Sequence, residues 1–196
     1  MKAGARAEDR RVRRTRERLH AALIPLVLEK GYDAVTIQDL LDRADVGRTT
    51  FYAHYRDKDD LLVAGLGHLR MFLCEHQRTA LARADEQERV LGFSLAMFEH
   101  AEEQRALFRA IVGRRAGTIV MQHVRRMFAD LVREDVAALA PEGAQVPIDA
   151  LVEFVVGSLM SILTWWLDRR TRLTAAEADA LFRRLTIPGL LAALGP

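Results

Sequence analysis

Apolar residues recur at intervals of three and four along most of the chain, the spacing that places them on one face of an α-helix. No stretch of useful length alternates apolar and polar residues, so no strand is predicted. The pattern therefore predicts an all-α protein of about nine helices. The expected helices cover about residues 13–30, 36–44, 48–55, 58–83, 104–112, 117–140, 148–170 and 175–185, and another begins near residue 85 and carries the apolar positions up to Phe98.

Two short helices joined by a tight turn are predicted between Thr36 and Tyr55. The first has its apolar face within residues 37–41, and the turn lies at residues 45–47. The second helix buries Phe51 and Tyr55. Its outward face has one cation, hydroxyl groups and an imidazole but no carboxylate, which suits the base edges and phosphates of a DNA major groove. These outward residues are Arg48, Thr49, Thr50, Tyr52 and His54.

This region resembles the DNA-binding region of the TetR family of bacterial transcription regulators. Residues 51–62 match the family's succession of aromatic, Tyr, His and aromatic residues, an acidic turn, and Lys before Leu-Leu. Residues 29–33 are similar to the family's preceding helix end, and the resemblance covers roughly residues 14–66. It implies an N-terminal helix–turn–helix DNA-binding domain at 13–60 and a ligand-binding and dimerisation domain at 61–196.

The resemblance places the helix at 48–55 in the major groove. Arg48 is suited to a bidentate contact with a guanine edge, whereas Thr49 and Thr50 are suited to a base or a thymine methyl group. The remaining polar residues near this helix are expected to hold phosphates. They are Thr36, Tyr52, His54 and Lys58.

Basic side chains are concentrated at the N-terminus. Residues 1–20 carry eight basic side chains against three acidic ones, whereas the whole chain has a net charge of only +2. We predict a disordered basic arm at 1–12. From residue 13, where the first helix is expected to begin, phosphate contact is favoured, with Arg14 as the candidate residue.

The predicted helix at 148–170 is apolar around most of its circumference, so a core alone does not account for all of its faces. A second copy of the chain is the simplest cover, and the resemblance implies a dimer built from the last two helices. A core helix of a monomer is the alternative. The expected interface residues are Leu151, Val155, Leu159, Ile162, Trp166, Leu181, Phe182 and Leu185.

Large and flexible side chains are numerous on the inward faces of the middle helices, where they form either a core or a pocket for an apolar small molecule. The resemblance favours a pocket, and it implies a homodimeric repressor that leaves a palindromic operator when a hydrophobic or aromatic effector binds. An activator of the same family, or a helical interaction protein without operator binding, is the alternative. The expected pocket residues are Phe72, His76, Phe93, Met97, Phe108, His123, Met127, Phe128, Met160 and Trp165.

Motifs for catalysis or cofactor binding are absent from the sequence. It contains no GxSxG, no phosphate-binding loop, no GxGxxG after a strand, no HExxH and no CxxC. We therefore expect no enzymatic activity, no cofactor and no metal site. No run of 18 apolar residues and no signal peptide are present, and the single cysteine, Cys74, cannot form an intrachain disulfide. These features predict a cytoplasmic protein that does not enter a membrane.

Overall fold

In the computed structural model the described residues form helices joined by turns and loops, and none of them lies in a strand, as the apolar spacing predicts. The chain forms two compact units. One runs to Gly67 and includes residues 110–120, and the other contains His68–Arg109 and the chain from Met121 onward. The structure describes residues 2–82, 86–111, 115–140, 146–168 and 171–194.

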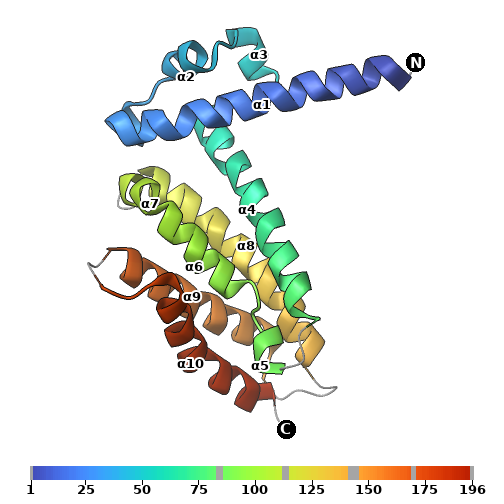
Figure 1. The fold of residues 1–196 in the computed structure, drawn as a ribbon, viewed down its shortest axis with the longest axis vertical. Coiled ribbons are helices and arrows are strands. Elements are labelled where there is room, and N and C mark those ends of the chain that lie inside the picture. The colour runs from blue at the N-terminus through green and yellow to red at the C-terminus, as the bar shows by residue number, and fades with distance from the viewer. Residues whose placement is uncertain (1, 83–85, 112–114, 141–145, 169–170, 195–196) are drawn as a thin grey trace. The chain divides into compact units, whose positions relative to one another are not determined.

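The N-terminal unit is built on one long helix, α1, with two short helices, α2 and α3, lying along one side of it (Figure 1). Gly31 ends α1 with a φ of 78°, a backbone conformation that glycine adopts without steric cost. The core of the unit is formed by Leu19, Leu23, Leu26, Val27, Leu40, Leu41, Phe51 and Tyr55. The elements are α1 (Lys2–Lys30), the 3₁₀ helix η1 (Tyr32–Ala34), α2 (Ile37–Ala44), α3 (Arg48–Tyr52) and the start of α4 (Lys58–Ala80).

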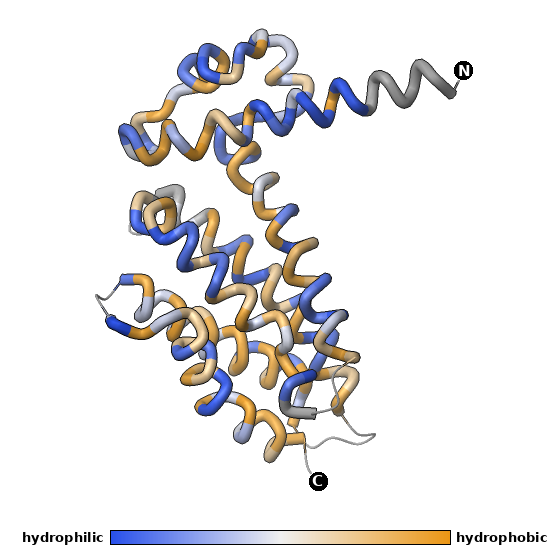
Figure 2. The backbone as a smooth tube through the Cα atoms, viewed as in Figure 1, coloured by the Kyte–Doolittle hydropathy of each residue, from blue (hydrophilic) through white to orange (hydrophobic). Residues whose placement is uncertain are grey.

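The beginning of α1 corrects one prediction. Residues 2–12 are helical in the structure, whereas a disordered arm was predicted at 1–12. The physical reason is local, because this segment is rich in Ala and Arg, which are good helix formers, and contains no proline. The first coloured stretch of α1 in Figure 2 is mostly hydrophilic. The N-terminal unit also extends to Gly67, inside α4, and so passes the predicted boundary at residue 60.

The C-terminal unit has α6, α9 and α10 packed against one another. Phe98 of α6 lies between the other two helices, with its ring centroid 5.7 Å from that of Trp166 and 6.2 Å from that of Phe182. The helices that lie wholly or mostly in this unit, apart from the end of α4, are α5 (Glu86–Arg89), α6 (Ser94–Glu103), α7 (Arg105–Ile111), α8 (Arg115–Leu139), α9 (Ile148–Asp168) and α10 (Ala175–Leu194). The end of α7 from Ala110 and the start of α8 up to Val120 belong to the N-terminal unit.

α9 is the most apolar helix of the C-terminal unit, as its colouring in Figure 2 shows. By length and composition alone it is capable of crossing a membrane. Eight of its side chains, however, are buried within the chain. The core helix of a water-soluble protein meets the same criteria, so the helix is weak evidence for a membrane span.

A turn at Val90–Phe93 separates α5 from α6, where the apolar pattern predicted one helix. Leu91 has a φ of 53°, which interrupts the helix. Side chains from distant helices satisfy the backbone of the turn. Asp135 of α8 accepts a hydrogen bond from the Leu91 N–H (2.8 Å), and Gln77 of α4 accepts one from the Phe93 N–H (3.0 Å). Gln77 also donates to Asp135, and burial raises the pKa of Asp135 to about 6.

Candidate functional site

The short helix α3 is held from beneath by aromatic residues. Phe51 is fully buried, and the Tyr55 hydroxyl lies 3.3 Å from Nε2 of His20 in α1. No side chain caps the N-terminus of α3, because Gly47 occupies that position. On the outer side Arg48, Thr49 and Tyr52 are exposed, and Thr50 and His54 are half-buried. The structure therefore brings the predicted base-reading residues together on one surface, which we call the α3 face. Its own residues include no acid, and Asp42 and Asp45 line the groove beside Arg48.

Arg48 is oriented by a neighbour on α2. Its Nη2 donates to Oε1 of Gln38 at 3.0 Å, across a groove of about 530 Å³ between the two helices. The turn that joins the helices is tied to α1, since Arg18 and Asp45 form an ion pair with a nitrogen–oxygen distance of 2.8 Å. These contacts fix the start of α3 and leave most of the Arg48 guanidinium donors available to a partner.

Thr36 is an N-cap residue in the structure, where a phosphate contact was predicted. Its Oγ1 accepts from the Asp39 N–H (3.2 Å) and donates to the Asp39 carboxylate (2.6 Å), and its own N–H donates to the same carboxylate. This capping box satisfies donors that the first turn of α2 would otherwise leave free. Lys30 also pairs with Asp39 at 2.6 Å, and the pKa of that carboxyl is lowered by Lys30 first and Thr36 second. Thr36 therefore organises α2.

Lys58 also has an internal role in place of the predicted phosphate contact. Its Nζ donates to the carbonyl oxygens of Tyr32 (2.9 Å), Val35 (2.8 Å) and Asp33 (3.3 Å). The ammonium group also lies 4.6 Å from the centroid of the Tyr32 ring. An ammonium group has three donors, and all three are directed at backbone carbonyls. Lys58 thus ties the start of α4 to the segment between α1 and α2.

Replacing Lys58 with methionine should lower the free energy of unfolding by about 2 kcal/mol, because the carbonyls it caps lose a charged donor. The variant should leave the salt dependence of DNA binding unchanged. Urea denaturation and binding titrations at several salt concentrations measure the two quantities. The matched control is Arg56→Met, since the Arg56 side chain is 88% exposed and its loss should leave stability unchanged. A flatter salt dependence with unaltered stability would contradict the internal role.

Arg14 lies on the exposed surface of α1, as a phosphate-binding residue requires. It belongs to a run of arginines at 10–18, and the arginines of this run are exposed. Glu17 is the only acid in this stretch of sequence, and it pairs with Arg13 at 3.5 Å. Exposed arginines at helical spacing give the first half of α1 a basic surface.

The predicted dimer residues divide into two groups. Leu185 is 59% exposed, and Ile162 and Leu181 are half-buried. The other five cannot form an interface between chains, because they already pack inside one chain against the neighbouring helices. These five are Leu151, Val155, Leu159, Trp166 and Phe182.

Among the described residues, no single one of the cavities given below gathers all of the predicted pocket residues. Four are core residues: Phe93 and Phe128 stack with ring centroids 6.2 Å apart, and Met97 and Met127 are buried beside this core. Phe72 is 43% exposed, and its ring lies against that of His76, with ring centroids 4.3 Å apart. The others are distributed over separate surfaces. His76 lines a cavity of about 150 Å³, Met160 and Trp165 line an open groove of about 600 Å³, and Phe108 and His123 are half-buried elsewhere.

Comparison with known families decides the identity of the chain. The family model described as bacterial regulatory proteins, tetR family, matches residues 20–64, and the model described as transcriptional regulator C-terminal region matches residues 88–187. The two matches cover the α3 face and the greater part of the C-terminal unit. The chain belongs to the TetR family. The sequence-based prediction of an all-α transcriptional regulator of this family is thereby confirmed, and the TetR family is one of regulators and not of enzymes.

Individual TetR-type relatives support the same assignment. The chain is 46% identical over 55 residues to the uncharacterized regulator YxbF of Bacillus subtilis, although the match spans only 14% of that protein. It is 27% identical over 169 residues to the transcriptional repressor KstR of Mycolicibacterium smegmatis, covering 83% of this chain and 81% of that one. Among solved structures, FadR of Thermus thermophilus with lauroyl-CoA shares the fold, with a TM-score of 0.65, 21% identity and coverage of 89% and 94%.

Two positioning residues of this TetR-family chain were missed by sequence reasoning. Gln38 orients Arg48, and Arg18 holds the turn through Asp45. The position of Gln38 next to Ile37, outside the apolar stripe of α2, was an available signal, because it places the side chain on the side that faces α3. Nothing local connects Arg18 with Asp45, which lie 27 positions apart.

Proposed function

We propose that this TetR-family protein is a homodimeric repressor that binds a near-palindromic DNA operator and is released by a small-molecule effector. The α3 face is the observation that carries the proposal. Arg48 and Thr49 project from it without a neighbouring acid on the helix, and both present groups suited to base edges. One recognition helix covers only a few base pairs, so specificity requires two copies related by a two-fold axis.

The electrostatics of α1 support DNA as the partner. The exposed arginines of residues 10–18 would attract the phosphate backbone and release counterions on binding. In this proposal Arg14 and its neighbours contribute affinity that does not depend on sequence, and the α3 face contributes discrimination between bases. Tyr52, which is 50% exposed, and the half-buried His54 are suited to phosphates beside the groove.

The exposed sides of α9 and α10 are the proposed dimer interface. Phe154 and Trp165 of α9 are exposed, and they lie on the same side of the helix as Gly157 and Ser161. A Cβ added at Gly157 would meet nothing within 4 Å, so a second helix has room to approach there. Leu185 extends this apolar surface onto α10. A second copy of the chain would cover these side chains and complete the four-helix arrangement expected for the family.

Repression and release by an effector are proposed by likeness to relatives. KstR is named a repressor, and the FadR structure holds lauroyl-CoA. The boundary between the two units falls inside α4, a single helix that includes both Lys58 and Gln77. In this proposal an effector acts through α4, because one helix runs through both units. To lower operator affinity 100-fold, the effector must bind the non-DNA-binding state more tightly than the DNA-binding state by about 2.7 kcal/mol. The proposed location is the cytoplasm.

Selection of duplexes from a random pool tests the proposal. The full-length protein should enrich a near-palindromic motif, and its affinity for the enriched duplex should fall steeply with salt concentration. Transcription from a promoter carrying the motif should decrease when the protein is present. Increased transcription would make it an activator. Failure to enrich any motif, together with binding insensitive to salt, would leave an interaction protein that retains the fold.

A further inference from the structure

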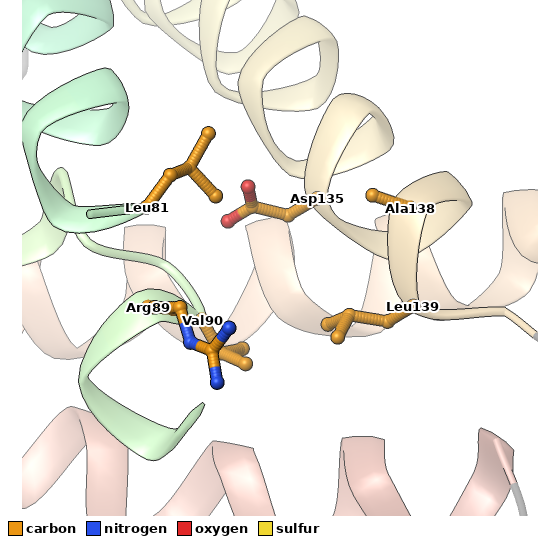
Figure 3. A pocket seen from close by; sticks show the side chains of 6 residues that line it. All are labelled: Leu81, Arg89, Val90, Asp135, Ala138 and Leu139. Carbon is orange, nitrogen blue, oxygen red and sulfur yellow. The ribbon is translucent and has the colours of Figure 1, made fainter. Parts of the chain in front are cut away.

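A cavity of about 200 Å³ lies where the end of α4, the α5–α6 turn and the end of α8 meet. Figure 3 shows Arg89 and Val90 on one side of it, Ala138 and Leu139 of α8 on the other, and Leu81 and Asp135 closing it above. Four of the six lining side chains are aliphatic. None of the residues predicted for the pocket lines this cavity, so it is a different site.

Arg89 supplies the unexplained polar group of this cavity. Its Nε is buried and has no hydrogen-bond partner within the described residues. A buried donor without an acceptor is costly, and the cost is larger when the donor belongs to a charged group. In contrast, the two oxygens of Asp135 already accept hydrogen bonds from the side chain of Gln77 and the backbone N–H of Leu91. Arg89 thus lacks a hydrogen-bond acceptor, whereas the Asp135 carboxylate already has two hydrogen-bond donors.

We propose that this cavity binds a small carboxylic acid with an apolar body, its carboxylate on the guanidinium of Arg89 and its body against Val90 and Leu139. A guanidinium group pairs with a carboxylate through charge-assisted, often bidentate hydrogen bonds. An apolar cavity of about 150 Å³ accommodates benzene. The space here therefore suits a benzene-sized body with one carboxylate attached. The binding of this ligand is independent of the proposed function. Only its role as the effector rests on that function.

A cationic ligand fits the cavity less well. It would be repelled by Arg89 and would leave the buried Nε without an acceptor. A neutral apolar ligand would fill the aliphatic part but would leave the same donor unsatisfied. Asp135 also lines the cavity, from α8 and across from Arg89 (Figure 3). Its two oxygens are taken up by donors of the protein, and burial raises its pKa to about 6, which weakens its repulsion of a bound carboxylate. The arrangement therefore favours an anion at the Arg89 end.

Calorimetric titration of the full-length protein with benzoate and with benzamide, which has the same shape without the charge, tests the proposal. The wild type should bind benzoate at least about tenfold more tightly than benzamide, the difference expected for one charge-assisted interaction. Arg89→Gln should abolish this preference, and Arg89→Lys should retain part of it. Equal affinity of the wild type for the two compounds, or binding of neither, would overturn the proposal.

Ala138→Phe provides a second variant that leaves Arg89 in place. Ala138 lines the cavity and is exposed, so a larger side chain can enter the space without displacing the core. It should prevent benzoate binding while the thermal unfolding midpoint stays unchanged. Unchanged benzoate binding in this variant would place the ligand elsewhere and overturn the proposal. Binding of the selected duplex is measured in parallel, without benzoate. If the protein does not bind the duplex under these conditions, the proposed function is refuted, but the carboxylate site is not.

Discussion

Replacing Arg48 with alanine should weaken binding to the selected duplex by about 1–3 kcal/mol per half-site and relax the preference for one base pair in each. The reason is that Arg48 is held at the start of α3 by Gln38, with most of its donors directed outward. Fluorescence anisotropy with the selected duplex, and with duplexes altered at each position, measures both effects. Binding to unrelated duplexes should change much less, because phosphate contacts dominate there.

Arg43→Ala is the matched control for this experiment. Arg43 is also an exposed arginine of the N-terminal unit, but its guanidinium makes a two-pronged contact with Glu29, at 3.0 and 2.8 Å. The control should bind the selected duplex as the wild type does. Equal losses of affinity in the two variants, or a uniform loss across all duplexes for Arg48→Ala, would show that Arg48 does not read bases.

Substituting Trp165 and Leu185 together with glutamate should yield a monomer. The two side chains are 36% and 59% exposed on the proposed interface, so the charges would be buried only on dimerisation. The monomer should lose about 10²–10⁴-fold in operator affinity, since each half-site would then be bound independently. Analytical ultracentrifugation and duplex titration measure the two results. Leu159 and Phe182 are unsuitable for this test, because they are fully buried within one chain.

Met71→Glu controls for the added charge. Met71 is 65% exposed and lies on α4, outside the α9–α10 surface. It should leave the oligomeric state and operator affinity unchanged. A wild type that sediments as a monomer at micromolar concentration, or a double variant that remains dimeric, would remove the proposed interface.

The N-terminal unit was the part most open to prediction, because local patterns determine it. Apolar spacing within 37–41 and the anchors Phe51 and Tyr55 are sufficient to orient α2 and α3, so the α3 face followed from the sequence. The structural roles of Thr36 and Lys58 could not be predicted from the sequence. Both are polar and near the surface, and the carbonyls that Lys58 caps lie more than 20 positions away in the chain.

The C-terminal unit was less predictable because its details depend on tertiary contacts. The turn around Leu91 is satisfied by Asp135 and Gln77, so no local signal ended the helix there. An apolar position on α9, such as Leu159, looks the same whether it is covered by its own chain or by a partner. Residue type also does not distinguish a packed core from a cavity: Phe93 and Phe128 proved to stack against each other.

The separation between anchoring and reading residues on α3 has an evolutionary consequence. Phe51 and Tyr55 are buried beneath the helix, whereas Arg48, Thr49 and Tyr52 are exposed on its outer side. Surface substitutions of this kind usually change stability by no more than about 0.5 kcal/mol. Under the proposed function, single substitutions at these positions would change the operator without a prior gain of stability elsewhere. Gene duplication followed by such changes would give paralogues that share one scaffold and do not cross-regulate one another's targets.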